Sequence, residues 1–336
     1  MEYAVFNRPI VTIYEVPDEI RKSEENVQSA IADEGLYGMI CKVLAIGGQG
    51  DAAADLPAGW AKIITFYGYP GYVHADELAC MGEGKMRSWL ANRFVQLGRA
   101  TDVMAQPASS SVRLMTLERG SRLQRLPERR PGEEDNGSPV REEGWARVRL
   151  IDGQQGYVRS VALGPQRYSL SAVFYLEEAM PFAQALAQAR GLAPEKMLQN
   201  TLDTWFAGSE DAFRQAVCDT AKQYLGTQYR WGGKTTRGID CSGLTSMAYL
   251  QNGVLLYRDA KIMPGWPVHE IAFEAKKPGD LLYFPGHIAL YLGEGCYIHS
   301  TGAAASGGVV LNSLNPADPR YRADLPEKLT AVGSVF

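Results

Sequence analysis

The feature that most constrains this 336-residue chain is an internal repeat. The segment GWAKIITFYGYPGYVHADEL (59–78) aligns without a gap on GWARVRLIDGQQGYVRSVAL (144–163). Upstream of each copy, VTIYEVP (11–17) is similar to TDVMAQP (101–107). A repeat in a chain long enough for two to four domains predicts two small domains of one fold and a different remainder.

Each copy of the repeat has the pattern of short β-strands separated by turns. In residues 145–150 apolar and polar side chains alternate, and the turn at 152–153 leads into a second strand, so we expect a hairpin. The two copies resemble bacterial SH3-like domains, which are small barrels common in cell-wall proteins. We predict one SH3-like domain over residues 1–82 and a second over 83–163, with a charged, exposed loop at 127–144.

After the second copy the pattern becomes helical. Apolar residues recur at helical spacing in three segments: 182–191, 194–206 and 211–226. From there to the C-terminus, strands and turns alternate. We therefore predict an α+β fold class, with two small barrels followed by a helical connector at 164–210 and an α+β domain at 211–336.

The composition excludes several classes of protein. With 46% hydrophobic and 21% charged residues the chain is typical of a globular protein, and a net charge of -4 does not indicate a nucleic-acid partner. No apolar run approaches the ~18 residues that would span a bilayer, so no membrane partner is expected. The five cysteines show no CxxC spacing, which argues against a disulfide framework and a structural zinc site.

The N-terminus bears on localisation. It contains Glu2 and lacks a basic region followed by a long apolar core, so it is not a recognisable export signal. We expect a cytoplasmic protein; the alternative is an exported one from which a signal has been removed.

The segment that carries chemistry is YRWGGKTTRGIDCSGLTSMAYLQNG (229–253). Its first half is rich in glycine and its second half has a helical apolar pattern, so Cys241 is predicted at the start of a helix. The helix N-terminus carries partial positive charge and unpaired N–H groups, which predicts a lowered pKa for this thiol and donors for an oxyanion. The remaining cysteines suit buried apolar positions: Cys41, Cys80, Cys218 and Cys296.

A thiolate nucleophile needs a base and an orienting partner, and the chain has four histidines. His287 opens HIALYLG, His299 lies in CYIHSTG, and the tight turn at 293–295 between them predicts a hairpin. If His287 donates through one ring nitrogen to His299, its other nitrogen is held toward Cys241. The alternatives are two structural histidines, or a zinc site that no HExxH or paired cysteine spacing supports.

Residues 211–336 resemble the NlpC-type cysteine peptidases, a papain-like family that acts on bacterial cell-wall peptides. The resemblance rests on four motifs in the expected order: YRWGGKTTRGIDCSGL, KKPGDLLYF, HIALYLG and YIHSTG. It implies that Cys241 is the nucleophile, His287 the base and His299 the polar third member, and that no metal or organic cofactor is needed.

The same resemblance implies further roles around the nucleophile. Tyr229, with the N–H of Cys241, is expected to stabilise the oxyanion, and Asp240 and Ser242 are expected to line the substrate pocket. Trp231 is expected to form a wall of this pocket, with a place in the core as the alternative.

The full arrangement, with SH3-like domains ahead of this domain, resembles that of a narrower group. This group is the γ-D-glutamyl-L-diamino acid endopeptidases that require a free N-terminal L-alanine. In that group acidic and tyrosyl side chains bind the alanine ammonium. The acidic residue that this group has in its catalytic domain matches Asp259. A longer peptide would leave this carboxylate without an ammonium partner, so it would be rejected. Glu34 and Tyr69 are the candidates in the first SH3-like domain, with ordinary surface residues as the alternative; Tyr69 aligns with Gln154 and is therefore not required by the barrel.

The sequence thus predicts a cysteine endopeptidase that cuts the γ-D-glutamyl-L-diamino acid bond of murein stem peptides, in cell-wall peptide recycling or degradation. Its partner would be L-Ala-γ-D-Glu-diamino acid. The alternatives are a Cys–His amidase or acyltransferase on another substrate, a non-catalytic wall-peptide binding protein, and an exported hydrolase of polymeric wall. Intact Cys241, His287 and His299 argue against the binding protein.

Overall fold

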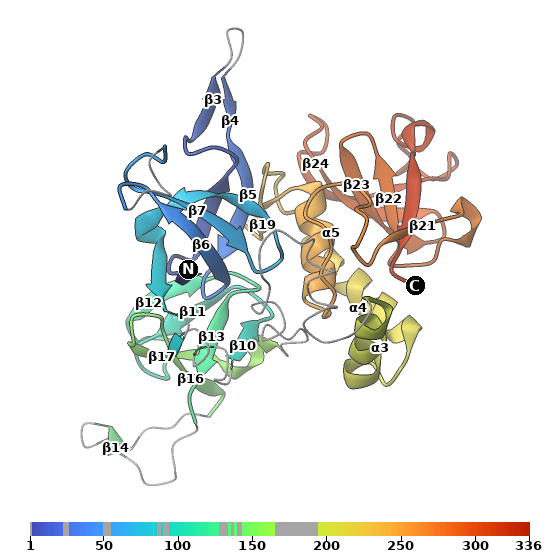
Figure 1. Cartoon of the computed structure of the whole chain (residues 1–336). Helices are drawn as coiled ribbons and strands as arrows, with labels where there is room; N and C mark the ends of the chain where they lie inside the picture. Colours follow the sequence, from blue (N-terminus) through green and yellow to red (C-terminus); the bar gives the residue numbers. More distant parts are fainter. Residues whose placement is uncertain are drawn as a thin grey trace. The chain divides into compact units, whose positions relative to one another are not determined.

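The computed structural model describes most of the chain, namely residues 2–22, 27–49, 55–82, 84–85, 89, 94–127, 134–135, 138–139, 143–164 and 194–336. The chain divides into two compact units, Met1–Gln166 and Arg167–Phe336. Figure 1 shows an all-β first unit and a second unit of helices and strands. None of the helices in the described ranges is long and apolar enough to span a membrane.

The first sheet of the first unit has the strand order β5-β2-β8-β7-β6-β1-β9. Its strands are β1 (Glu2–Phe6), β2 (Ile10–Tyr14), β5 (Ile31–Leu36), β6 (Ile40–Ile46), β7 (Trp60–Thr65), β8 (Pro70–His74) and β9 (Leu78–Met81). A separate hairpin of β3 (Ile20–Lys22) and β4 (Val27–Ser29) projects from this sheet (Figure 1). A 3-10 turn, η2 (Ala75–Glu77), connects β8 to β9.

The second sheet has the order β12-β11-β17-β16-β13-β10-β18. Its strands are β10 (Phe94–Leu97), β11 (Thr101–Met104), β12 (Arg113–Leu117), β13 (Arg122–Arg125), β16 (Trp145–Arg149), β17 (Gln155–Arg159) and β18 (Leu163–Gly164), with η3 (Ser160–Ala162) before β18. Each strand occupies the place of its counterpart in the first sheet, because the two orders match position by position. The hairpins β7–β8 and β16–β17 also share one register, with Trp60 opposite His74 and Trp145 opposite Arg159. The predicted repeat and its hairpin are therefore confirmed.

The predicted loop at 127–144 is described only in part. Glu134–Asp135 (β14) and Ser138–Pro139 (β15) form a two-stranded ladder. The other residues of this loop, except 127 and 143–144, lie outside the described residues.

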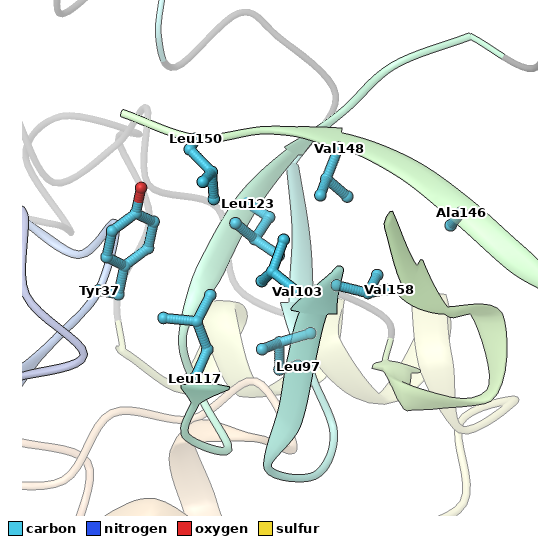
Figure 2. Packing of buried hydrophobic residues seen from close by; sticks show 9 residues of the cluster. All are labelled: Tyr37, Leu97, Val103, Leu117, Leu123, Ala146, Val148, Leu150 and Val158. Carbon is cyan, nitrogen blue, oxygen red and sulfur yellow. The ribbon is translucent and has the colours of Figure 1, made fainter. Parts of the chain in front are cut away.

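The two sheets of the first unit share a core through Tyr37, which lies in the turn between β5 and β6. Its side chain is 2% exposed and packs among the buried residues of the second sheet (Figure 2). These are Leu97, Val103, Leu117, Leu123, Ala146, Val148, Leu150 and Val158. The backbone N–H of Ile151 donates to the Tyr37 hydroxyl at 2.7 Å, and the N–H of Arg122 donates to the Tyr37 carbonyl at 2.8 Å. Burial raises the pKa of Tyr37 to about 12, so the hydroxyl stays neutral within this shared core.

Gly38 makes the close approach of the two sheets possible. Its φ is +76°, and a Cβ atom there would lie 2.1 Å from the carbonyl oxygen of Arg122. We expect Gly38→Ala to lower the free energy of unfolding of the first unit by more than the ~1–2 kcal/mol that a left-handed conformation costs an L-residue. Gly48→Ala is the control, because Gly48 has a φ of +79° with open space around it. Urea denaturation of both variants tests this, and equal losses would contradict it.

The second unit contains a mixed set of helices and an antiparallel sheet. The helices are α3 (Pro194–Trp205), α4 (Glu210–Lys222) and α5 (Cys241–Leu250), with 3-10 turns η4 (Phe273–Ala275) and η5 (Pro326–Lys328). The six-stranded sheet has the order β21-β26-β22-β23-β24-β25. Its strands are β21 (His269–Ile271), β22 (Leu281–Phe284), β23 (His287–Gly293), β24 (Cys296–Thr301), β25 (Gly308–Ser313) and β26 (Ala331–Ser334). A short pair, β19 (Lys234–Thr235) and β20 (Gly238–Ile239), precedes α5, and α5 packs on β23 and β24.

The structure confirms two of the three predicted helical segments, as α3 and α4. The third, 182–191, lies outside the described residues, as does the larger part of the predicted connector. Helix α4 ends at Lys222, before Gly226, because turns continue the chain over 223–226.

Candidate active site

Cys241 is the first residue of α5, as predicted, and a network of backbone contacts fixes this helix start. The Asp240 carboxylate is the N-cap: Oδ1 accepts from the N–H of Gly243 at 2.5 Å, and Oδ2 accepts from the N–H of Gly232 at 2.9 Å. A Cβ atom at Gly243 would lie 2.1 Å from the carbonyl oxygen of Gly233. The glycines around Cys241 thus allow the preceding loop to pack directly on the first turn of the helix.

Arg258 ties this helix start to the segment that follows α5. Its guanidinium binds Asp240 at 2.9 Å and 3.2 Å and donates to Ser242 Oγ at 2.7 Å. The Arg258 and Asp240 side chains are only 3% and 9% exposed. None of these contacts involves a substrate, so the pocket roles predicted for Asp240 and Ser242 stay predictions. The sequence did not reveal the role of Arg258, whose one signal was its position beside Asp259.

Burial dominates the electrostatics of the Cys241 thiol. It raises the pKa of Cys241 to about 11, and the Asp240 carboxylate acts in the same direction. The backbone N–H groups of Ile288 and Ser242 donate to the sulfur and, with the charge of Arg258, lower this pKa by less. The prediction of a lowered thiol pKa was therefore wrong, because Cys241 is 7% exposed and desolvation outweighs the helix N-terminus. The resting side chain is a neutral thiol that needs a base.

The histidine hairpin is confirmed. His287 begins β23, His299 lies on the adjacent β24, and His287 Nε2 lies 2.7 Å from His299 Nδ1. Ile288, the neighbour of His287 in the chain, donates its N–H to the sulfur of Cys241, so His287 is held beside the nucleophile. His299 Nε2 in turn lies 2.8 Å from Oδ1 of Asn312, a residue that the sequence analysis did not single out.

Both histidines are neutral in the folded protein. Burial is the main cause that lowers the pKa of His287 to about 3 and that of His299 to about 4, and the positive charge of Arg322 adds to it. His287 is therefore unprotonated over a wide pH range. Among the residues that the structure describes, no group of three His, Cys, Asp or Glu side chains is arranged to hold a metal ion.

The low pKa of His299 predicts that the second unit loses stability in acid. Unfolded histidine takes up a proton near pH 6.5, whereas folded His299 does so near pH 4. The unfolded state binds more protons between these values, so the free energy of unfolding falls as the pH falls. The loss from one such histidine reaches about 2–3 kcal/mol at about pH 4.5.

Urea denaturation near pH 7 and near pH 4.5 measures this loss. His299→Gln is expected to reduce the difference between the two pH values. His269→Gln, at an exposed position in β21, is the control and should keep the wild-type difference. An unchanged pH dependence in His299→Gln would contradict the prediction.

The structure also places the remaining predicted residues of the second unit. Burial raises the pKa of Tyr229 to about 12, with a further contribution from Cys241 and Asp240, so its hydroxyl lies near the thiol and stays protonated. The Asp259 carboxylate is partly buried and accepts a hydrogen bond from the Tyr257 hydroxyl. Trp231 is 58% exposed, so the alternative of a core position is wrong.

Glu34 and Tyr69 lie in the first unit. Glu34, in β5, is 4% exposed, so it is not an ordinary surface residue. The N–H of Tyr69 donates to Thr65 Oγ1 at 3.0 Å in the turn between β7 and β8. Beside these two residues, the Tyr67 hydroxyl donates to the buried carboxylate of Asp33, an acid–tyrosine pair that the sequence analysis missed. The substrate-binding roles of Glu34 and Tyr69 stay predictions.

A cysteine at the start of a buried helix, packed on an antiparallel sheet that carries a histidine pair, defines the second unit as a papain-like cysteine peptidase domain. The family model described as NlpC/P60 matches residues 226–320. Dipeptidyl-peptidase 6 from Lysinibacillus sphaericus is 34% identical over 317 residues, which cover 94% of this chain and 95% of that enzyme. The chain therefore belongs to the NlpC/P60 family of peptidases.

One more relative and two solved structures are similar to this chain. The probable peptidoglycan endopeptidase LytE from Bacillus subtilis is 34% identical over 109 residues, 30% of each chain. An NlpC/P60 family protein from Bacillus cereus has a similar fold, with a TM-score of 0.62 at 18% identity over 98% of both chains. An NlpC/P60 endopeptidase from Photobacterium damselae has a TM-score of 0.57 at 12% identity and covers 99% of this chain and 72% of its own.

Proposed function

We propose that this peptidase hydrolyses the bond between γ-D-glutamate and the diamino acid in murein stem peptides that carry a free N-terminal L-alanine, in cell-wall peptide recycling. The observation that carries the proposal is similarity over nearly the whole chain to an enzyme named dipeptidyl-peptidase 6. A dipeptidyl-peptidase removes two residues from the N-terminus of its substrate. In a murein stem peptide those two residues are L-alanine and γ-D-glutamate, and the bond that is cut is the one proposed.

The reaction uses Cys241 as nucleophile and His287 as base. Since burial disfavours a charged pair before substrate binds, His287 takes the proton of the neutral thiol as the sulfur attacks the γ-carbonyl carbon. The N–H of Cys241 and the hydroxyl of Tyr229 stabilise the oxyanion. His287 then returns the proton to the amine of the departing diamino acid. Water hydrolyses the thioester, again with His287 as base.

The free N-terminus of the substrate is bound by Asp259. This carboxylate is oriented by the Tyr257 hydroxyl and follows Arg258, which holds Asp240 and Ser242 on either side of the nucleophile. The ammonium of L-alanine makes a charge-assisted hydrogen bond with the carboxylate. An N-acetylated peptide leaves that carboxylate without a cation and is rejected.

The test is cleavage of L-Ala-γ-D-Glu-diaminopimelate beside its N-acetylated form. The wild type is expected to cut the free peptide with a kcat/KM at least about 100-fold higher. Asp259→Asn is expected to reduce this preference, whereas Asp219→Asn, at an exposed position of α4, should keep it. Equal cleavage of both forms would retain the peptidase and remove the role of Asp259. Failure to cut either would favour an amidase, an acyltransferase or a wall-peptide binding protein.

A further inference from the structure

A chain of hydrogen bonds runs beyond the two histidines and ends on a backbone carbonyl group. His287 Nε2 meets His299 Nδ1 at 2.7 Å, and His299 Nε2 meets Asn312 Oδ1 at 2.8 Å. Asn312 Nδ2 then donates to the carbonyl oxygen of Arg320 at 2.8 Å. Asn312 lies on β25, which pairs with the strand of His299. The chain therefore crosses three adjacent strands and a loop.

The carbonyl of Arg320 determines the direction of every bond in this chain. A carbonyl oxygen only accepts, so the NH2 group of Asn312 must face it and the amide oxygen must face His299. The N–H of Ser313 donates to the same carbonyl oxygen at 3.1 Å, which holds the acceptor in place. Because the amide oxygen of Asn312 also only accepts, His299 must carry its proton on Nε2.

The tautomer of His299 then determines the tautomer of His287. A neutral imidazole with a proton on Nε2 has a lone pair on Nδ1, so His299 accepts from His287. His287 therefore carries its proton on Nε2, and its Nδ1 keeps a lone pair. Burial keeps His299 neutral at neutral pH, since it lowers the pKa of this histidine to about 4.

We infer that Asn312 is a positioning residue, which fixes the tautomer of His287 through His299 and so leaves Nδ1 of His287 as the nitrogen that takes the proton of Cys241. The inference rests on the role of His287 as base in the proposed function. It adds a residue that touches neither the substrate nor the nucleophile.

Water cannot replace Asn312 in fixing the tautomer of His299, because it does not reach this side chain. His299 is 0% exposed, and both of its ring nitrogens are engaged, one with His287 and one with Asn312. Without the Asn312 oxygen, the tautomer of His299 with a proton on Nδ1 becomes accessible. It would donate to Nε2 of His287 and place the proton of His287 on Nδ1, where the nitrogen no longer accepts.

The charged and polar groups around the histidine pair come from neighbouring elements. Arg322 and Asp324 lie in the loop after β25, where Arg322 binds Asp324 through Nε at 2.9 Å and also through Nη2. Both affect the pKa values of His287 and His299. The Tyr297 ring packs on His299 with centroids 5.3 Å apart. These groups shift the titration of the pair, while Asn312 sets its tautomer.

The direct test is two-dimensional ¹⁵N–¹H spectroscopy of the imidazole rings, which distinguishes the two neutral tautomers. In the wild type both His287 and His299 are expected to carry the proton on Nε2. Asn312→Ala is expected to populate the other tautomer and to lower kcat on the order of 10- to 100-fold with little change in KM. The control is Asn315→Ala, at an exposed loop asparagine whose side chain accepts from the backbone N–H of Ala317 at 3.0 Å.

The pH profile of Asn312→Asp gives a second readout that a merely structural role would not affect. A carboxylate still accepts from His299 Nε2, but it raises the pKa of His299, and a protonated His299 donates to His287. The acid limb of kcat is therefore expected to move up by about 1–3 pH units, with activity retained at alkaline pH. A uniform loss at every pH would overturn the inference.

The outcome for the tautomer is separable from the outcome for the substrate. If the wild type fails to cut the murein tripeptide, the proposed function fails, whereas the ¹⁵N spectra still test the role of Asn312. A proton on Nδ1 of His287 in the wild type would overturn the inference. Should Asn312→Ala fail to fold, the wild-type spectra and the profile of Asn312→Asp decide.

Discussion

Replacement of Cys241 by alanine is expected to lower kcat on the murein tripeptide on the order of 10⁴-fold or more, because the reaction proceeds through a covalent bond to its sulfur. The fold should survive, since the start of α5 is held by Asp240 and Arg258 and not by the thiol. Chromatographic detection of the released diamino acid measures the loss. Circular dichroism and urea denaturation verify that the variant is folded.

Cys218→Ala is the control for this prediction. Cys218 is 2% exposed in the middle of α4, and burial raises its pKa to about 11, as it does for Cys241. Its sulfur donates to the carbonyl oxygen of Tyr291 at 3.8 Å. The two thiols are similarly buried and have similar pKa values, so only their positions distinguish them. Cys241 lies at a helix start beside His287, whereas Cys218 lies within a helix. Comparable losses of kcat in both variants would argue against Cys241 as the nucleophile.

The features that the sequence predicted correctly are those that depend on local pattern. The alternation in 145–150 and the turn after it gave the hairpin β16–β17, and the glycine-rich approach to Cys241 gave the start of α5. The tight turn at 293–295 placed His287 and His299 on adjacent strands, and these two side chains lie in contact. In each case, one short segment contains the whole signal.

The features that the sequence did not predict depend on contacts between distant segments. Arg258 reaches back over 18 residues to Asp240, and no spacing rule relates these two positions. Asn312 reaches His299 only because β24 and β25 pair in one particular register. The direction of the Cys241 pKa shift was missed for the same reason: the helix start is visible in the sequence, whereas the burial that outweighs it comes from the packing of α5 on the sheet.

Arg258→Leu is expected to combine a large loss of stability with a loss of activity. The substitution leaves the Asp240 carboxylate buried without its cation, which costs about 3–5 kcal/mol in the free energy of unfolding. It also removes the contact with Ser242, the residue after the nucleophile. Displacement of the first turn of α5 by about 1 Å is enough to lower kcat on the order of 100-fold.

Arg214→Leu separates these two effects. Arg214 and Asp280 form a second buried pair in the same unit, with a 2.7 Å contact and side chains 6% and 1% exposed. This pair joins α4 to the segment before β22 and contacts neither α5 nor the histidines in any hydrogen bond described. Arg214→Leu should therefore cost a similar 3–5 kcal/mol.

The two variants are compared by urea denaturation and by kcat per folded molecule, at a temperature where both remain folded. Arg214→Leu is expected to keep the wild-type kcat. An equal loss of kcat in the two variants would show that Arg258 acts only through global stability. A normal kcat in Arg258→Leu would show that the backbone N–H groups of Gly232 and Gly243 hold Asp240, and with it the nucleophile, without the help of the guanidinium.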